Sequence, residues 1–387
     1  MSLFEISSFS CPTRIHFGFD ARKRLPDIVA SQAWKRLFLI IDPALVGGEF
    51  HSSIDTLLQG SGVALDVFSQ IEPEPKDTTA KAAFERCRAH RAEAILAVGG
   101  GSTIDVAKAA AILMTNGGSI SDYEGIEKFS IPPLPLVAVP TTAGTGSEVS
   151  GACVITDTGR DVKMAIRHAV FGPAQFAILD PLAVSTAPAH VAAHSGIDAF
   201  VHAFESYLSK KANAFSDAVN LHAMHLICGS IRQFVANRQN PTAALDMLCG
   251  SSMAALSFGT TGLGNVHCMA MSLGSHFAVP HGLANAVCLP TAAEFNFIAN
   301  PDRYATVAGV MGIDTAGMSR LDAGRAALQA LRDLCADLGV PSRLRDVGAT
   351  EDKIESMARQ SFKSDYNRWN PRYTTEKEFV ALFTKAF

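Results

Sequence analysis

Residues 94–108 read AILAVGGGSTIDVAK, the pattern of a buried strand, a tight glycine turn and the start of a helix. Glycines let a backbone approach a pyrophosphate, and the free N–H groups and dipole of a helix N-terminus attract its negative charge. We therefore predict that Gly99, Gly100, Gly101 and Ser102 contact a nucleotide, although a plain tight turn would have the same sequence. The spacing of Ser102 and Asp105 also indicates a capping box at the helix start.

Two further strand ends support a nucleotide site. The run Arg36–Ile41 ends at Asp42, whose carboxylate could bind ribose hydroxyls and repel a 2′-phosphate, which favours NAD over NADP. The alternative is a surface aspartate that starts a turn. The run Leu134–Val139 leads into PTTAGTGSE, and we expect its hydroxyls at Thr141, Thr142 and Thr145 to contact the cofactor. A turn whose hydroxyls bond their own backbone is the alternative here.

The surrounding sequence up to about residue 183 alternates strand runs with helical patterns, as in an α/β domain. The runs are apolar on both faces, which is typical of a parallel sheet covered by helices on both sides. A hairpin is predicted at Ala152–Thr156 and Val162–Ile166, around the turn at residues 157–160. The remaining predicted strands are Val63–Phe68, Ala94–Val98 and Phe176–Leu179.

From about residue 186 the pattern becomes helical, for example over Ala214–Val235 and Ala243–Ser257. We predict an α/β, mostly parallel, Rossmann-like NAD-binding domain over residues 1–183. An all-α metal-binding and catalytic domain follows over residues 184–387. The joint is expected near Leu179-Asp180-Pro181, because a strand that ends at Asp-Pro must turn.

Composition excludes several functional classes. The 387 residues are 48% hydrophobic and 18% charged, which suits a globular protein with a large core, and the net charge of −4 provides no basic face for nucleic acid. The N-terminus shows no secretory signal, and the apolar runs are too short to span a membrane. Eight cysteines without a CxxC pair indicate reduced thiols in the cytoplasm and direct the search for a metal site to histidines and carboxylates.

A metal site is predicted in the second half. Asp198 and His202 are four residues apart on a helical stretch and so share one face, although an aspartate that only orients a histidine has the same spacing. His267 and His281 bracket an apolar segment, where core histidines with hydrogen-bond partners are the alternative. One carboxylate and three imidazoles can hold Fe(II) or Zn(II) and leave one coordination position open.

Taken in order, the motifs resemble those of the iron-containing (group III) alcohol dehydrogenases, whose fold is similar to that of dehydroquinate synthase. The resemblance runs from about residue 10 to about residue 380. It rests on the segments GGGSTIDVAK, PTTAGTGSE, GIDAFVHAFESY, GLGNVHCMAMSLG and VPHGLANAVCLP and on Asn370-Pro371-Arg372.

The resemblance implies metal ligation, and with it the catalytic centre, at Asp198, His202, His267 and His281. It places NAD contacts at Asp42, Gly99, Gly100, Gly101, Ser102, Thr141, Thr142, Thr145 and Lys163. It also implies a homodimer paired through the strand around Pro12–Phe17.

One position departs from the family pattern. Members usually carry a second histidine four residues after the first, near the nicotinamide, and Met271 stands there instead. His276 and His194 are possible replacements in the proton path, although packing roles or support of the metal ligands suit them better.

The resulting interpretation is a metal-dependent, NAD-linked alcohol dehydrogenase or aldehyde reductase that acts on small primary alcohols or aldehydes by hydride transfer. Two alternatives are a metal-dependent lyase or cyclase of the dehydroquinate synthase type and a non-catalytic NAD-binding protein. Against the lyase stand the apolar residues near the predicted ligands, among them Phe200, Phe204 and Phe258, which suggest a weakly polar substrate. Against the non-catalytic protein stands the complete set of metal ligands.

Overall fold

A computed structural model describes residues 8–387, which group into two compact units. The α/β unit comprises residues 10–187 and 239–248. The helical unit comprises residues 188–238 and 249–387 together with Ser8 and Phe9. Over the described part of the chain, no helix is long and apolar enough to cross a membrane.

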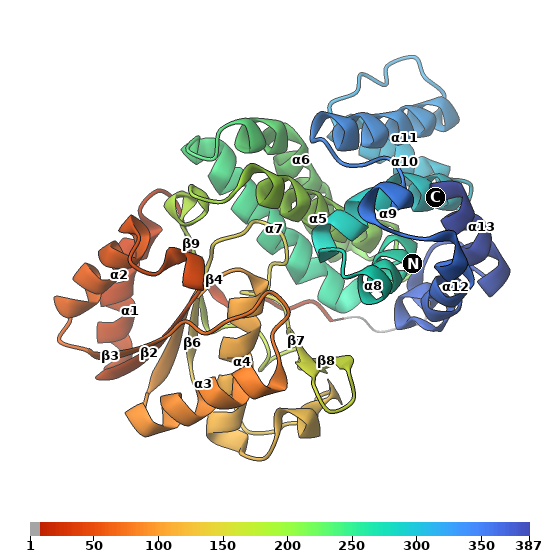
Figure 1. Cartoon of the computed structure of the whole chain (residues 1–387). Helices are drawn as coiled ribbons and strands as arrows, with labels where there is room; N and C mark the ends of the chain where they lie inside the picture. Colours follow the sequence, from red (N-terminus) through yellow and green to blue (C-terminus); the bar gives the residue numbers. More distant parts are fainter. Residues whose placement is uncertain (1–7) are drawn as a thin grey trace. The chain divides into compact units, whose positions relative to one another are not determined.

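The α/β unit is built on a six-stranded sheet in which all neighbouring strands are parallel, in the order β1-β9-β6-β4-β2-β3 (Figure 1). The predicted strands are confirmed, and their ends shift by at most two residues. The bounds are β1 (Arg14–Phe17), β2 (Arg36–Ile41), β3 (Ala64–Phe68), β4 (Ala94–Gly99), β6 (Leu136–Pro140) and β9 (Phe176–Leu179).

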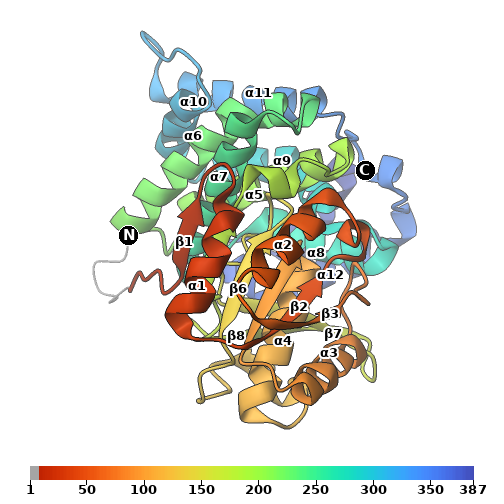
Figure 2. The ribbon, with the colours of Figure 1, turned by 90° about the vertical axis from the view of Figure 1, so that its left-hand side faces the viewer.

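Helices cover both faces of this sheet, as the two-sided apolar runs predicted (Figure 2). Alternate residues of β2 divide between the two cores. Leu37, Leu39 and Ile41 belong to the core formed with α1 (Leu25–Gln32) and α2 (Glu49–Gln59). Phe38 and Ile40 belong to the core formed with α3 (Asp77–His90) and α4 (Gly101–Asn116).

A smaller three-stranded sheet completes the α/β unit. The predicted hairpin is confirmed, since β7 (Ala152–Asp157) and β8 (Val162–Arg167) pair in antiparallel orientation. Its turn is closed by the Asp157 carboxylate, which accepts hydrogen bonds from the backbone N–H groups of Gly159 and Arg160. The short strand β5 (Gly125–Ile126), which was not predicted, pairs with β8.

The helical unit confirms the change of pattern after residue 186. All strands of the described residues lie between Arg14 and Leu179, so the fold class is an α/β part followed by an all-helical part. Every residue of α5 from Gly196 to Leu208 is buried, as expected for a helix with apolar residues on all sides. The helices after residue 188 are α5 (Ala189–Leu208), α6 (Ala214–Ala236), α7 (Pro241–Thr261), α8 (Asn265–Phe277), α9 (His281–Phe297), α10 (Pro301–Val310), α11 (Arg320–Asp337), α12 (Ile354–Lys363) and α13 (Glu376–Ala386). The part of α7 up to Leu248 belongs to the α/β unit.

Candidate active site

Three predicted nucleotide-binding segments lie together at the carboxyl ends of neighbouring strands of the large sheet. They follow β2, β4 and β6, which are neighbours in the sheet. The backbone N–H of Thr141 donates to the carbonyl of Gly99 at 3.0 Å, and that of Asp42 donates to the carbonyl of Val98 at 2.9 Å. Ligands of such sheets bind beyond the carboxyl ends of the strands, where these segments lie.

The glycine turn packs directly against the hydroxyl-rich loop. A Cβ added to Gly101 would lie 2.9 Å from Cγ2 of Thr145, and one added to Gly100 would lie 3.3 Å from the side chain of Thr142. None of the three glycines at 99–101 has a positive φ. Gly100 and Gly101 are therefore required by the close approach of the loop, and Gly99 by Thr103, with whose side chain an added Cβ would clash.

The start of α4 differs from the prediction. The residue before the helix is Gly100, which has no side chain to cap it, so Ser102 already lies in the first turn. Ser102 donates to the carbonyl of Pro73, and Asp105 accepts from Ser147 Oγ at 2.7 Å and from the backbone N–H of Val154 at 2.9 Å. The predicted capping box is thus wrong, and no side chain of the N-cap residue bonds the first N–H groups of α4, which could therefore bind an anion.

Two charged side chains of α4, the buried Lys108 and the half-buried Asp105, join the same elements. Lys108 Nζ donates to the carbonyls of Ser150 at 2.8 Å and Ala152 at 2.7 Å. Burial lowers the pKa of Lys108 and raises the pKa of Asp105, and in each case the opposite charge of the other acts against the shift. Since both side chains leave α4, they hold the end of the hydroxyl-rich loop and the start of β7 against that helix.

The remaining predicted NAD contacts lie within the same unit. Asp42 Oδ1 accepts from the backbone N–H of Ala44 at 2.9 Å, so this carboxylate does start a turn. Lys163 lies on β8 and its Nζ donates to Glu74 at 2.6 Å. Next to Asp42 opens a hollow of about 480 Å³, lined by Pro43, Phe68, Ser69, Gln70, Ile71, Glu72, Thr78, Thr79 and Ala82.

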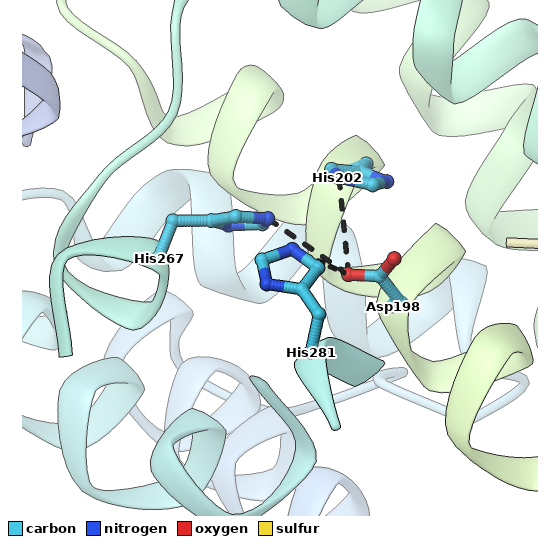
Figure 3. A group of neighbouring side chains, drawn as sticks. All are labelled: Asp198, His202, His267 and His281. Atoms are coloured by element: carbon cyan, nitrogen blue, oxygen red, sulfur yellow. Dashed lines mark ion pairs between the residues drawn. The ribbon is translucent and has the colours of Figure 1, made fainter. Parts of the chain in front are cut away.

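The four predicted metal ligands converge in the helical unit (Figure 3). Asp198 and His202 come from α5, His267 from α8 and His281 from the first position of α9. Their ligand atoms all lie within 4.8 Å of one another. Asp198 Oδ1 is 3.8 Å from Nε2 of His202, 3.8 Å from Nε2 of His267 and 3.7 Å from Nε2 of His281.

Electrostatics favour the protonation states that a metal ion requires. Burial raises the pKa of Asp198, but the three histidines, His202 first, and the Asn285 amide outweigh it and lower this pKa overall. Burial lowers the pKa of His267 well below its ordinary value, and the neighbouring histidines add to this. An ionised carboxylate and a neutral imidazole are the ligating forms.

Asn285 provides a test of whether a cation fits. Its Nδ2 lies 2.7 Å from Asp198 Oδ1, 3.1 Å from His281 Nε2 and 3.2 Å from His267 Nε2, so one amide N–H₂ group faces a carboxylate oxygen and two ring nitrogens. Its Oδ1 is buried without a hydrogen-bond partner. The cluster thus converges on a positively polarised group. Ligands about 2.0–2.2 Å from one ion can be up to about 4.4 Å apart, which accommodates the spacings around Asp198.

Sequence analysis missed Glu205, which the structure places in the same cluster. This buried residue lies on α5, and its Oε2 is 2.7 Å from His267 Nδ1. Burial raises its pKa to about 7, against the effect of three backbone N–H groups that bond to it. A signal was available, because Glu205 and Asp198 are the only charged side chains of a helix otherwise rich in apolar residues, and buried acids need partners.

The residues considered as replacements for the family's second histidine have different surroundings. Met271 lies one turn after His267 on α8 and is 46% exposed. His276 has both ring nitrogens engaged, Nδ1 with the carbonyl of Ser272 and Nε2 with Ser356 Oγ. His194 lies one turn before Asp198, and burial followed by the charge of His190 lowers its pKa.

Comparison with known proteins places this geometry in a family. The iron-containing alcohol dehydrogenase family matches residues 12–181, and its C-terminal part, described as "Fe-containing alcohol dehydrogenase family, C-terminal", matches residues 192–387. A 1,3-propanediol dehydrogenase of Citrobacter freundii is 42% identical over 91% of this chain and 92% of its own length.

Solved structures agree. A crystal structure of a 1,3-propanediol oxidoreductase superposes with a TM-score of 0.96 at 37% identity, over 99% of this chain and 100% of that one. A sulfoacetaldehyde reductase from Bifidobacterium kashiwanohense, solved in complex with NAD⁺, gives a TM-score of 0.88 at 28% identity, over 99% of each chain. The chain therefore belongs to the iron-containing alcohol dehydrogenase family and is a metal-dependent, NAD-linked alcohol or aldehyde oxidoreductase.

Proposed function

We propose that this enzyme interconverts short primary alcohols and aldehydes, with a catalytic centre formed by Asp198, His202, His267 and His281. The observation that carries the proposal is the convergence of these four ligand atoms within 4.8 Å of one another. When bound there, a divalent cation, Fe(II) or Zn(II), would act as a Lewis acid toward the oxygen of the alcohol or aldehyde.

The chain's own residues divide the remaining work. Asp198 lowers the net charge of the centre, and the three imidazoles fix its geometry. His281 is the most open of the four, with a side chain that is 48% exposed, whereas Asp198 and His267 are each 3% exposed. We therefore expect the substrate to enter from the side of His281.

The nicotinamide cofactor is assigned to the α/β unit. The N-terminus of α4, with Gly99, Gly100, Gly101 and Ser102, would bind the pyrophosphate, and Thr141, Thr142 and Thr145 would contact it from the adjoining loop. Asp42 and the hollow beside it suit the adenosine part, and its carboxylate favours NAD over NADP. Lys163 is placed near the nicotinamide ribose by family resemblance.

A small substrate is proposed from two sources. The relatives named above are a 1,3-propanediol dehydrogenase, a 1,3-propanediol oxidoreductase and a sulfoacetaldehyde reductase, whose names give three-carbon and two-carbon substrates. Of the apolar side chains once expected around the ligands, Phe200 and Phe204 are fully buried and stack on each other at 5.7 Å, so they belong to the core. Phe258 stacks on His202 at 4.5 Å and does line the cluster. We favour short primary alcohols, including terminal diols, and the matching aldehydes.

Assembly and location complete the proposal. We assign residues 1–183 to cofactor binding and residues 184–387 to the metal centre.

A homodimer is favoured by β1, which is an edge strand of the large sheet. Two aromatic side chains at its end are exposed, Phe17 by 66% and Phe19 by 63%. Unpaired edge strands are prone to pair with another copy. A cytoplasmic location suits eight free cysteines.

The decisive experiment mixes metal-free protein with NADH and each of a panel of short aldehydes, and follows NADH oxidation by absorbance. Fe(II) without oxygen and Zn(II) in air are added back in separate arms. We expect turnover only after metal is restored, with three-carbon hydroxyaldehydes among the best substrates. Turnover that is undiminished in the metal-free protein would refute the assigned centre, and no turnover with either metal while NADH still binds would refute the assigned reaction.

A further inference from the structure

The cluster contains a second carboxylate, Glu205, which contacts the ring nitrogen of His267 that points away from the other proposed ligands. His267 directs Nε2 toward Asp198 Oδ1, and its other ring nitrogen, Nδ1, lies 2.7 Å from Glu205 Oε2. The two carboxylates thus lie on opposite sides of one imidazole ring. Both acids leave the same helix, α5, whereas His267 lies on α8.

Glu205 also binds the backbone that carries His267. Its two oxygens accept from the N–H groups of Val266 at 2.7 Å, Gly264 at 3.1 Å and His267 at 3.3 Å. These are N–H groups at the start of α8, which have no partner within the helix. One buried carboxylate therefore fixes both the start of the helix and the ring on its first turn.

A second residue caps the same helix without touching the ring. Asn370 Oδ1 accepts from the backbone N–H of Asn265 at 3.0 Å. Gly264 is so close to both caps that an added Cβ would lie 2.7 Å from Asn370 Oδ1 and 3.0 Å from Glu205 Oε1. Asn370 is therefore a natural control, because it supports α8 and leaves His267 Nδ1 alone.

We propose that Glu205 is a positioning residue of the metal centre, which holds His267 as the tautomer with hydrogen on Nδ1 and leaves Nε2 free to bind the cation. The inference rests on the proposed metal centre. A carboxylate behind a ligating histidine fixes the ring, makes Nε2 more basic, and typically changes metal affinity by about 10- to 100-fold when it is removed.

The test compares Co(II) binding by the full chain with Glu205→Gln and Asn370→Ala. Affinity is measured by competition with a chelator, and the ligand field is followed through the visible Co(II) bands. We expect Glu205→Gln to bind about 10- to 100-fold more weakly with shifted bands. Asn370→Ala should lower the unfolding temperature but keep the affinity and bands of the wild type.

The outcomes separate the two claims. Wild-type protein that binds no Co(II), or binds it equally well after Asp198→Ala, would overturn the proposed centre and this inference with it. Wild-type binding that Glu205→Gln leaves unchanged, or that Asn370→Ala weakens equally, would overturn the inference alone.

If the Glu205→Gln protein does not fold, a second measurement tests the proposal without a variant. In wild-type protein with isotopically labelled histidine nitrogens, magnetic resonance reports which nitrogen of His267 carries hydrogen. Hydrogen on Nδ1 supports the proposal, and hydrogen on Nε2 alone overturns it.

Discussion

Asp198 is the residue on which the metal centre depends most. Its Oδ1 lies 3.7 to 3.8 Å from Nε2 of all three histidines and also accepts a hydrogen bond from the Asn285 amide. When they bind a metal, the two buried histidines beside it, His202 and His267, would do so as neutral imidazoles, with no charge of their own to attract a cation. Asp198 is thus the one acid among the four proposed ligands, and it provides the negative charge that a bound cation would contact directly.

Replacement of this carboxylate should abolish catalysis while the fold remains. We expect Asp198→Ala to lose the metal ion and about 10³-fold in turnover, since a catalytic cation contributes several kcal/mol to the transition state. Metal analysis and NADH oxidation check the two losses. Asp352→Ala, at a side chain that is 70% exposed, should retain both. A metal-loaded, fully active Asp198→Ala enzyme would contradict the assignment.

At position 101 only glycine fits without a clash, because the side chain of Thr145 leaves no space for a Cβ. Gly101→Ala would place a methyl group 2.9 Å from Cγ2 of Thr145, and overpacking of this kind costs about 1–3 kcal/mol. We expect NAD to bind about 10- to 100-fold more weakly by fluorescence titration. Gly229→Ala, whose Cβ would meet nothing within 4 Å, should leave NAD affinity unchanged. Rescue by the added substitution Thr145→Ala would identify the contact as the cause.

Helix α4 connects several parts of the α/β unit through two charged side chains, of which Lys108 is buried and Asp105 half-buried. Its first turn adjoins the hydroxyl-rich loop, and Asp105 and Lys108 reach Ser147, Ser150, Ala152 and Val154. The geometry of the proposed cofactor site therefore depends on hydrogen bonds that these two charged side chains make behind it.

Removal of one charge of this pair should be costly. We expect Lys108→Met to lower the free energy of unfolding by about 1–3 kcal/mol, because it leaves the carbonyls of Ser150 and Ala152 without their donor and Asp105 without a nearby opposite charge. Denaturant unfolding measures the change, with exposed Lys81→Met as the control. The double variant Lys108→Met with Asp105→Asn should recover part of the loss. A loss equal to that of Lys81→Met would mean that the pair contributes nothing.

At the level of helices and strands, the sequence predicted those features that depend on the pattern of neighbouring residues. Buried runs such as Arg36–Ile41 and Phe176–Leu179 were located to the residue, because covered parallel strands are apolar on both faces. Asp198 and His202 were paired because helical spacing places them on one face. His267 and His281 were grouped with them as candidate ligands because imidazoles in an apolar segment need partners, and the family resemblance then implied that all four bind one metal.

What depends on distant partners could not be predicted. Asp105 was interpreted as a cap, but its partners Ser147 and Val154 lie more than 40 residues away. Glu205 and Asn285 acquire their roles only when α5, α8 and α9 pack together, since each bonds a residue of another helix. The two-residue strand β5 is too short to produce a periodic pattern.

For the whole chain, the metal ion should be a source of stability. Its proposed ligands come from three helices, so an ion bound only by the folded state would stabilise it by about 2.7 kcal/mol at a hundredfold excess over its Kd. We expect Tm to rise when Zn(II) or Co(II) is added to metal-free protein. Mg²⁺, which prefers oxygen ligands, should have little effect. The same rise in Asp198→Ala would locate the stabilising ion elsewhere.

That all four proposed ligands lie within helices also bears on how this chain can change in length. Helical residues follow one another at about 100° around the axis, so one residue inserted between Asp198 and His202 would turn one ligand away from the other. An insertion at residues 209–213, between α5 and α6, would leave every ligand in register. Natural and engineered length variants should therefore accumulate between these helices, and those within residues 198–205 should be lost.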